Sequence, residues 1–446
     1  MEIKGLIYTV LIMAFCTIPV RAKQWTLQDC INYATANSIV IQQAKNAAEE
    51  SYIDVKSSKA ELFPTLSFST GHNITNRPYQ ENSNTVSGTE IITSNNKTTY
   101  SGNYGLNAQW IIWNGNKRRN SIKQKKTSSQ IAELSVAEQQ NLLKEQITQI
   151  FIQILYADES IKINQNTLNT SKASYERAEE LFKEGSISKA DLAQLNAQLS
   201  NDEYQLVCSE SALRDYKLQL KQLLEIEDTE EMDLCLNEIN EQNIIKELPN
   251  VEEVYRKAVQ LRPEIKSGKL NIENSKISMS IAKSGYLPTV SLNASTGSTT
   301  NSSSTNSWGK QFKLGWNNMI GISLSIPIFD NRQNKSAVEK ASVQYQNSML
   351  ELINKQKELY KSIEGFWLEA TNAQKQYLSA KAKTNSCLTS YEIVSEQFNL
   401  GMKNTIELLT EKNNLLSAQQ QEIQAKYMTL LNRTLLNFYA NQTIEL

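Results

Sequence analysis

Two stretches of the chain alternate between apolar and polar residues, which is the pattern of a β-strand with two different faces. Apolar or aromatic side chains occupy nearly every second position of residues 100–112, and residues 314–328 largely repeat the arrangement. Shorter alternations begin at Thr65 and Thr289. A period of two places one side of a strand in apolar surroundings and the other side in polar surroundings. The pattern therefore predicts four strands, grouped as two hairpins.

Polar tracts separate the two strands of each predicted hairpin. Residues 293–307 contain thirteen Ser, Thr or Asn among fifteen positions, and residues 73–99 are similarly polar. Such tracts lack the apolar side chains that a packed core needs, so we expect long exposed loops. The single histidine, His72, lies in a polar loop beside the first strand and is expected to be solvated.

Most of the remaining chain predicts long helices. The 446 residues include only 15 glycines and 7 prolines, and both residue types are scarce between residues 117 and 248 and after Pro327. Residues 117–182 alone would form a helix of about 100 Å, at ~1.5 Å per residue. Apolar or aromatic residues seven apart mark a left-handed coiled-coil seam in this segment and in residues 332–398. The seam residues are Ile147, Ile154, Ile161, Leu168, Tyr175 and Phe182, then Ile363, Ala370, Tyr377, Thr384, Tyr391 and Phe398.

The two halves of the sequence match each other. Residues 62–68 resemble residues 286–292 at an offset of 224, and from Trp113 onward the halves keep an offset of 216. A match that holds its register over nearly eighty residues indicates duplication. We therefore predict a first repeat at residues 23–249 and a second at residues 250–446. Each contains a helix, a β-hairpin and a long helical hairpin, and the first repeat ends in an acidic connector.

Each repeat is predicted to begin with a helix. The first runs over residues 27–62 and ends before Pro64, because the residue before a proline is pushed out of the helical region. The second runs over residues 251–286, with a break at Pro263. The acidic connector at residues 226–249 joins the two repeats and is expected to be a solvated linker.

The N-terminus has the features of a secretory signal peptide. Lys4 precedes an apolar run over residues 5–20, and Val20-Arg21-Ala22 provides a small-residue cleavage site, so residues 1–22 are assigned to the signal. A single membrane anchor is the alternative, but the run is shorter than the ~20 residues that a span needs. Four cysteines remain after cleavage, and their spacing leaves their disulfide state open. They are Cys30, Cys208, Cys235 and Cys387.

Composition and residue types disfavour several function classes. Lys and Arg total 46 against 47 Asp and Glu, a net charge of −1, whereas a nucleic-acid-binding protein should carry a basic surplus. Because the single histidine, His72, is expected to be solvated, no Ser/His/Asp or Cys/His set can be completed elsewhere, and no Gly-rich phosphate loop occurs. We therefore expect no enzyme activity, no cofactor and no metal site.

The strands point instead to a membrane β-barrel. Four of the six tryptophans, Trp110, Trp113, Trp308 and Trp316, lie in or beside the predicted strands, as aromatic residues do in such barrels. An ordinary β-sandwich is the alternative. Four strands cannot close a barrel, and an open edge cannot sit in lipid, so several chains must combine. Eight strands leave an interior filled by side chains, and a conducting barrel therefore favours twelve.

Taken together, the order of elements resembles the TolC-like outer-membrane efflux proteins. The resemblance rests on three features. Near its start the mature chain has Trp25-Thr26-Leu27-Gln28-Asp29-Cys30-Ile31, the first strand of each hairpin is entered through Phe-Pro-Thr or Leu-Pro-Thr, and each helical hairpin turns at Phe-x-x-Gly. It implies a mixed α/β membrane protein: a homotrimer with a 12-stranded barrel in outer-membrane lipid and a coiled-coil α-barrel in the periplasm of a Gram-negative bacterium.

That resemblance also implies a passive exit duct. Small molecules or polypeptides would be delivered by an inner-membrane pump and a periplasmic adaptor protein. The alternative is a surface or periplasmic coiled-coil scaffold, such as an adhesin stalk, which would use the same helices but leave the alternating strands unexplained. The sequence indicates neither the exported substrate nor the resting state of the gate.

Two glycine-marked turns are expected to form the periplasmic tips. Gly185 and Gly401 are the reversals of the two long helical hairpins. In the resembled family this turn meets the adaptor, so the matching residues are predicted to dock it. The alternative is that glycine only permits a left-handed helix cap. The predicted docking residues are Gly185, Ser186, Ser188, Gly401, Met402 and Asn404.

A gate is expected just past the second turn. Lys403, Glu407 and Glu411 are four residues apart and share one helical face. The resemblance places an acidic constriction at Glu407, with Asp191 as its counterpart in the first repeat and Lys403 as a latch to neighbouring helices. Thr410 stands where the family carries a second acid, so a double ring is not expected. The alternative is a solvated face laced with salt bridges.

Overall fold

The computed structural model describes residues 24–79, 81, 83–87, 90–94, 97–227, 232–235, 241–442 and 444. The predicted signal peptide at residues 1–22 and parts of the acidic connector lie outside these residues. The chain divides into two compact units, and each combines segments from both halves of the sequence. The helical unit comprises Met1–Lys45, Ser135–Lys266 and Asn354–Leu446, and the strand unit comprises Asn46–Leu134 and Ser267–Ile353. This division cuts across the predicted repeats, which stay a prediction.

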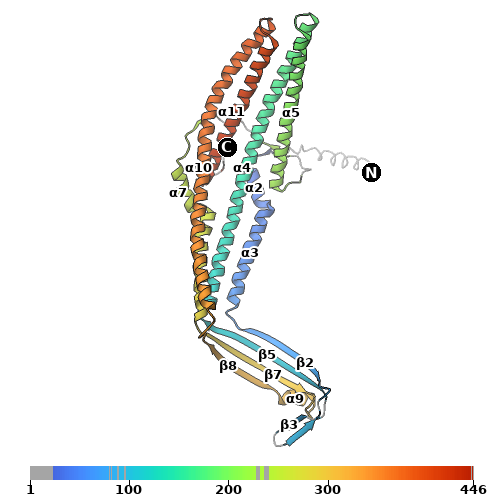
Figure 1. The fold of residues 1–446 in the computed structure, drawn as a ribbon, viewed down its shortest axis with the longest axis vertical. Helices are drawn as coiled ribbons and strands as arrows, with labels where there is room; N and C mark the ends of the chain where they lie inside the picture. Colours follow the sequence, from blue (N-terminus) through green and yellow to red (C-terminus); the bar gives the residue numbers. More distant parts are fainter. Residues whose placement is uncertain are drawn as a thin grey trace, which may run out of the picture. The chain divides into compact units, whose positions relative to one another are not determined.

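A four-stranded antiparallel sheet forms the centre of the strand unit (Figure 1). The central pair, β5 and β7, joins one strand from each half of the sequence, so the predicted hairpins lie side by side in a single sheet. The strand order is β2 (Thr65–Asn76), β5 (Thr98–Asn114), β7 (Thr289–Asn301) and β8 (Asn317–Ser325).

The register confirms the predicted alternation. Trp110 of β5 lies opposite Leu292 of β7, which lies opposite Ile322 of β8. One face is therefore apolar across the strands, and the other carries Ser, Thr, Asn and Gly. The apolar face is exposed, as the 68% exposure of Phe68 and the 79% exposure of Ile320 show.

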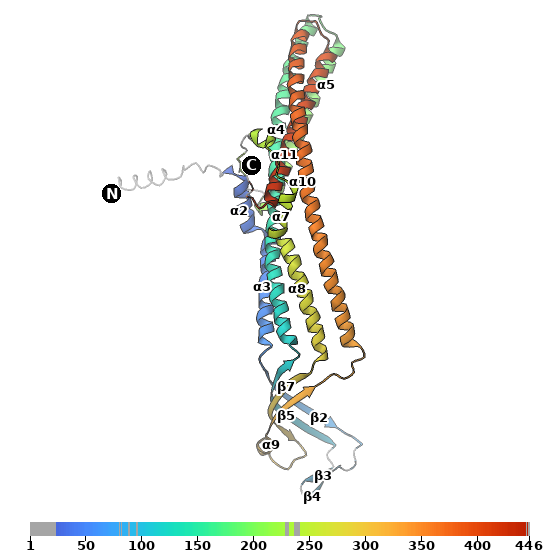
Figure 2. The same cartoon turned by 90° about the vertical axis from the view of Figure 1, so that its left-hand side faces the viewer.

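The predicted loop at residues 293–307 is largely wrong. Strand β7 continues to Asn301, because its polar residues pair with β5 as far as Ser101. A short helix, α9 (Trp308–Leu314), follows and lies against β7 (Figure 2). Alternation assigned residues 314–328 to a strand, but Leu314 ends α9 and the strand itself covers Asn317–Ser325. Strand β8 ends at Ser325, which pairs with Thr289 at the start of β7, and Pro327 beyond it has no N–H to donate to a neighbouring strand.

The predicted loop at residues 73–99 is also shorter than expected. Strand β2 runs to Asn76, and a second hairpin forms from β3 (Ser83–Ser87) and β4 (Glu90–Ser94). His72 therefore lies within β2 rather than in a loop. Its Nδ1 is 2.6 Å from the Tyr100 hydroxyl, since the register places the two residues on neighbouring strands.

Polar contacts join the helices of the strand unit. These helices are the main part of α3 (Ile39–Ala60), most of α8 (Pro263–Lys283), and the first turns of α4 (Lys117–Lys183) and α10 (Gln333–Asn399). Lys125 of α4 pairs with Asp54 of α3 at 2.7 Å. The Ser275 and Ser348 hydroxyls of α8 and α10 are 2.6 Å apart.

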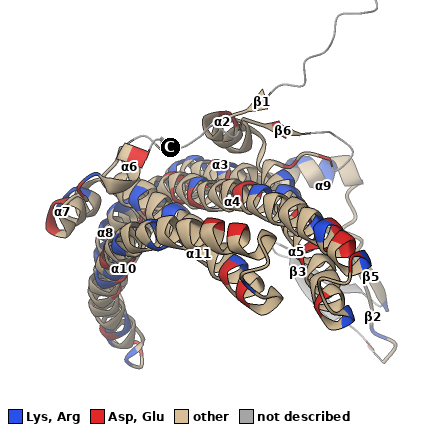
Figure 3. Cartoon of the chain, turned by 90° about the horizontal axis from the view of Figure 1, so that it is seen from above, with Lys and Arg blue, Asp and Glu red and all other residues tan. Residues whose placement is uncertain are grey.

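Four long helices build the helical unit. Helix α4 turns back into α5 (Lys189–Leu224), and α10 turns back into α11 (Thr405–Tyr439). Charged residues of both signs are spread along these helices (Figure 3). The largest apolar core gathers residues of α2 (Leu27–Asn37), α4, α5 and α11, including Cys30, Ile31, Ile147, Phe151, Ile154, Leu155, Leu220, Leu224, Ile423 and Leu430.

The first predicted helix, residues 27–62, is in fact two helices. Ser38 takes an extended conformation between α2 and α3, just as Arg262 does between α7 (Val251–Leu261) and α8. The two breaks stand at the offset of 224 that relates the halves. Pro263 made the second break predictable, whereas nothing in the residue types around Ser38 indicated the first.

The described parts of the acidic connector are packed rather than simply solvated. Strand β6 (Asp233–Leu234) pairs in parallel with β1 (Gln24–Trp25). Helix α6 (Glu241–Ile245) lies against α10, where Glu241 pairs with Lys381 at 2.6 Å. Ile244 is fully buried against Tyr377 and Ala425. The connector therefore fastens the helices that it crosses.

The predicted coiled-coil seam holds for only part of α4. Ile147 and Ile154 are buried, but Phe182 is 39% exposed. Toward the turn, the buried positions become Ala157, Asn164, Ser171 and Ala178, which are also seven apart. A straight helix drifts relative to a seven-residue repeat, so the buried stripe moves to other positions. The side that α4 buries near the turn is thus made of small and polar residues.

Candidate functional site

The first helical reversal is closed by glycine. Helix α4 ends at Lys183, and Gly185 has φ +77°. The Gly185 N–H donates to the Phe182 carbonyl at 3.0 Å, and the Ser186 N–H donates to the Leu181 carbonyl at 2.8 Å. This is the Schellman arrangement, which satisfies carbonyls that a helix end leaves without partners.

The second reversal repeats that geometry. Gly401 has φ +74°, its N–H donates to the Phe398 carbonyl at 2.9 Å, and the Met402 N–H donates to Gln397 at 2.9 Å. A Cβ built on either glycine would meet no atom within 4 Å. Met402 is 72% exposed, so this turn presents an apolar side chain to its surroundings.

Asp191 caps the helix that follows the first reversal. The Ser188 hydroxyl accepts the Asp191 N–H at 3.1 Å, and the Asp191 carboxylate accepts the Ser188 N–H at 3.2 Å. These reciprocal bonds form a capping box at the start of α5. Hydrogen bonds from Ser188 lower the pKa of Asp191, and the Thr405 hydroxyl contributes to the shift.

Glu407 likewise forms a capping box at the start of α11. Its carboxylate accepts the Asn404 N–H at 3.1 Å, and the Asn404 side chain accepts the Glu407 N–H at 2.9 Å. Lys403 donates to the other carboxylate oxygen at 2.5 Å. The hydrogen bond from Lys403 is the main cause that lowers the pKa of Glu407, and the hydrogen bond from the Asn404 N–H is the second.

The structure brings some predicted gate residues together but not all of them. Lys403 and Glu407 form a pair within one segment, as the salt-bridged alternative expects. Glu411 instead accepts a hydrogen bond from Ser390 of α10 at 2.8 Å. Thr405 is buried at the start of α11, and Leu195 of α5 packs with Leu408 of α11, so the capped ends of α5 and α11 are neighbours.

Apolar packing holds the two reversals side by side. A small core there joins residues from the ends of all four long helices. Its buried members are Ala178, Leu195, Phe398, Leu408 and Leu409. The two hairpins of one chain therefore end together.

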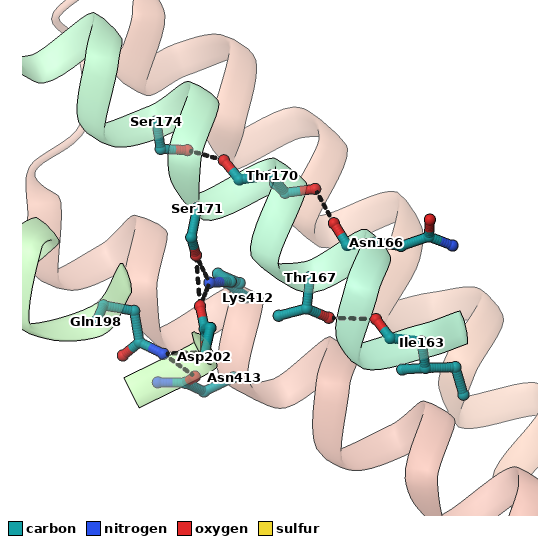
Figure 4. Close-up of polar contacts among 10 residues, drawn as sticks. All are labelled: Ile163, Asn166, Thr167, Thr170, Ser171, Ser174, Gln198, Asp202, Lys412 and Asn413. Atoms are coloured by element: carbon teal, nitrogen blue, oxygen red, sulfur yellow. Dashed lines mark hydrogen bonds and ion pairs between the residues drawn. The ribbon is translucent and has the colours of Figure 1, made fainter. Parts of the chain in front are cut away.

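A buried ion pair that sequence analysis missed lies farther along the same hairpins (Figure 4). Lys412 of α11 points between α4 and α5, where its ammonium group contacts the Asp202 carboxylate and the Ser171 hydroxyl. The three side chains come from three helices, and all three residues are buried. They lie at a polar part of the seam, where sequence pattern assigns charged residues to solvent.

Neighbouring amides complete this cluster. The Gln198 amide donates to Asp202 Oδ1 at 2.9 Å and reaches Asn413 Oδ1 at 3.5 Å. Both carboxylate oxygens of Asp202 thus have partners. Burial lowers the pKa of Lys412, and the hydrogen bond and charge of Asp202 oppose that shift. Asp202 stands seven residues after the buried Leu195, which is the signal that could have placed it in the seam.

Comparison with known proteins identifies the family. A family model described as outer membrane efflux protein matches residues 30–224 and 254–442. The chain belongs to the outer membrane efflux protein family. The predicted resemblance is therefore confirmed.

Two curated relatives of this efflux protein family match part of the chain. The alkaline protease secretion protein AprF of Pseudomonas aeruginosa is 23% identical over 178 residues, which cover 40% of this chain and 36% of AprF. The outer membrane protein TolC of Escherichia coli is 23% identical over 159 residues, which cover 34% of this chain and 32% of TolC. The matched segments thus span about a third of the length of these relatives.

Solved structures share the fold over nearly the whole chain. CusC superposes with a TM-score of 0.80 at 16% identity and covers 95% of this chain and 93% of its own. The Campylobacter jejuni outer membrane channel CmeC has a TM-score of 0.77 at 17% identity, with 94% and 87% covered. The open state of Neisseria gonorrhoeae MtrE has a TM-score of 0.74 at 16% identity, with 93% and 88% covered. The predicted fold class, strands combined with long helices in the TolC-like manner, is confirmed.

The described residues of this efflux family member form neither a metal site nor a disulfide. Within the described residues, no group of His, Cys, Asp or Glu has the arrangement of a metal site. No disulfide joins Cys30, Cys208, Cys235 and Cys387. None of the described helices combines the length and the apolar character that a membrane crossing demands.

Proposed function

We propose that three copies of this chain form a channel in the outer membrane that extends into the periplasm. It acts as a passive exit duct for small molecules or polypeptides, which an inner-membrane pump delivers through a periplasmic adaptor. The observation that carries this proposal is the open four-stranded sheet with an exposed apolar face. Among the described strands, β2 and β8 each have a neighbour on one side only.

An open sheet of this kind needs partners. Unpaired strand edges expose backbone groups that lipid cannot satisfy, so a sheet in a membrane must close on itself. Three copies supply twelve strands, which enclose a wide lumen, whereas eight strands are filled by side chains. The β8 edge of one copy would then pair with the β2 edge of the next.

The apolar face has the layout of a lipid-facing surface. Trp110 lies near one end of β5 and Tyr104 lies six residues away, near the middle of the strand, with Leu106 and Ala108 between them on the same face. Six residues of strand separate the two aromatic rings, a span of about 20 Å. Outer-membrane barrels carry an apolar band of about 25 Å between two aromatic girdles.

The opposite face suits a water-filled lumen. Its residues in β7 include Ser291, Asn293 and Ser295, and in β8 Gly321 and Ser323. Small uncharged polar side chains of this kind line a passage without favouring either sign of charge. This composition supports a conduit for several kinds of substrate.

The relatives support the transport role. AprF is named as a secretion protein for alkaline protease, and CmeC and MtrE are named as outer membrane channels. The predicted duplication into residues 23–249 and 250–446 is consistent with a family model that matches in two segments. These names support a role in export.

The two reversals are proposed as the adaptor-docking tips, and the residues beside them as the gate. Exposed glycines and the exposed Met402 side chain offer a surface for another helical protein. Trimer symmetry would turn Glu407 into a ring of three carboxylates, with Lys403 partly balancing the charge. Asp191 would be its counterpart in the first hairpin.

Conductance tests the proposal. Purified protein added to a planar lipid bilayer is expected to produce uniform stepwise increases in current, and the protein should remain in the outer-membrane fraction after a carbonate wash. A coiled-coil scaffold would be released by carbonate and would leave the bilayer current unchanged. That result would contradict the proposed function.

A further inference from the structure

The second hairpin carries an unusual distribution of charge. Between residues 289 and 329 only two side chains are charged, Lys310 and Lys313. Both lie on the short helix α9 and both are exposed. Neither forms an ion pair with any residue that the structure describes. The positive charge of this hairpin is therefore concentrated on one turn of helix.

Helix α9 is held firmly on the sheet. The Ser298 hydroxyl of β7 donates to the Phe312 carbonyl at 2.7 Å. The Gln311 side chain accepts the Asn301 N–H at 2.8 Å and donates to the Asn306 carbonyl at 2.7 Å. These three bonds tie the helix to the end of β7 and to the turn before it, so the positions of its side chains are defined.

Aromatic rings fill the space between α9 and the sheet. Phe312 stacks on Trp308 with ring centres 5.4 Å apart and meets Tyr104 of β5 at 5.6 Å. Ser298 and Thr300, which share the apolar face of the sheet, are buried. The helix therefore covers the point where that face turns polar and replaces it with an aromatic surface.

The side of α9 away from the sheet carries the two lysines. At ~100° per residue, Lys310 points about 160° away from Phe312 and Lys313 about 100° away, so neither lysine shares the direction of the ring that faces the sheet. Leu314 lies next to Lys310 around the helix, about 160° from Phe312, and is 67% exposed. Two ammonium groups beside an exposed apolar side chain and tryptophan rings are the arrangement of a helix that lies in the interface of a membrane.

We propose that α9 is a binding site for anionic, phosphate-bearing lipids at the outer rim of the barrel. Lys310 and Lys313 bind the lipid phosphates, while Leu314 and the exposed part of Trp308 contact the acyl chains. The proposal rests on the proposed function, because only a lipid-facing sheet brings α9 against lipid. Strand β7 begins after α8 and runs away from it, so α9 stands at the end of the sheet remote from the helices of the strand unit.

Lipid retention by the full-length protein tests this site. The purified protein is incorporated into nanodiscs that contain equal parts of phosphatidylglycerol and phosphatidylcholine. The protein is then released from the nanodiscs, and the lipid molecules that stay bound to it are counted by native mass spectrometry. Wild-type protein is expected to retain phosphatidylglycerol preferentially. Lys310→Gln combined with Lys313→Gln should weaken that preference roughly 30-fold, at about 1 kcal/mol for each lysine.

Matched variants distinguish lipid binding at α9 from a general effect of positive charge on the protein surface. Lys335→Gln combined with Lys340→Gln removes two exposed lysines of α10 and should leave the preference unchanged. Phe312→Ala keeps both lysines but removes the ring that seats the helix, and should reduce the preference. An equal loss in the α10 variant, or no loss in the α9 variant, would overturn the proposal. So would complete displacement of the lipid by millimolar inorganic phosphate.

Failure of the lipid site and failure of the channel give different results. Conductance is recorded from the same preparations. If wild-type channels conduct but the α9 lysine variant still retains phosphatidylglycerol, only the lipid site is overturned. Wild-type protein that does not conduct would overturn the proposed function, whatever lipid it retains.

Discussion

Lys412 of α11 and Asp202 of α5 form an ion pair buried between the two helical hairpins, with 6% and 2% of each residue exposed. The pair ties together segments that are 210 residues apart in sequence. Its partners Ser171 and Gln198 satisfy the remaining polar atoms. Such a pair favours one register of the hairpins, because any other register would leave a buried charge without a partner.

Removing one member of this pair should destabilise the helical unit. Lys412→Met is expected to lower the free energy of unfolding by about 3–5 kcal/mol, because Asp202 would stay buried without its cation. Replacing both charges, with Lys412→Met and Asp202→Leu, should be close to neutral. Urea unfolding followed by circular dichroism measures both effects. Lys383→Met, at an exposed lysine of α10, is the control, and an equal loss there would contradict the assignment.

The capping carboxylates should make the tips sensitive to acid. The pKa values of Asp191 and Glu407 are lowered in the folded chain. Their contribution is therefore fully present above the unfolded carboxyl pKa of about 4 and is lost as the pH falls through the lower folded pKa. Hydrogen exchange at residues 186–192 and 402–408, corrected for its intrinsic pH dependence, should show constant protection from pH 5 to pH 8 and reduced protection below pH 4. Loss of protection between pH 6 and pH 8 would exclude these groups as the cause.

Two substitutions at Glu407 separate its charge from its cap. Glutamine can still accept the Asn404 N–H, so Glu407→Gln should reduce cation selectivity and block by multivalent cations while the helix end stays ordered. Glu407→Ala should lose both the cation selectivity that comes from the charge and the ordered helix end that comes from the cap. Lys403→Ala should raise the basal conductance, since it leaves the carboxylates unbalanced. Single-channel recording decides this, and unchanged selectivity in both Glu407 variants would make Glu407 a structural cap only.

Bulky residues at the tips should block export without disturbing assembly. Gly185 and Gly401 have positive φ values but open space around them, so tryptophan would strain the turn and project outward. Gly401→Trp is expected to abolish export and adaptor binding while the amount of assembled protein in the membrane stays normal. Leu368→Trp, at an exposed position in the middle of α10, is the control. Normal export by the Gly401 variant would remove the docking role.

The sequence predicted the features that have a strong local cause. Alternation placed β5 and β8 on the correct faces, and glycine placed both reversals, because a positive φ favours that residue. Pro263 similarly marked the break before α8. Each of these residues constrains its own backbone, so its effect can be recognised without knowledge of the surrounding fold.

Features that depend on distant partners were missed. Residues 293–301 look like a loop, yet pairing with β5 makes them a strand. In the sequence, Lys412 and Asp202 look like solvated charges. They are buried because Lys412 of α11 and Asp202 of α5 pair with each other between the helices. Asp191 and Glu407 were predicted as gate residues, and the structure adds a capping role that their position three residues after Ser188 and Asn404 could have indicated.

The number of chains in the assembled particle tests the central claim most directly. Among the described strands, one chain supplies four to the sheet, with β2 and β8 at its edges, and the proposed function requires three chains to close it. Native mass spectrometry of the protein released from detergent micelles should give a single species of three mature chains, which persists when the detergent is diluted. A stable monomer or dimer would contradict the shared barrel and the channel built on it.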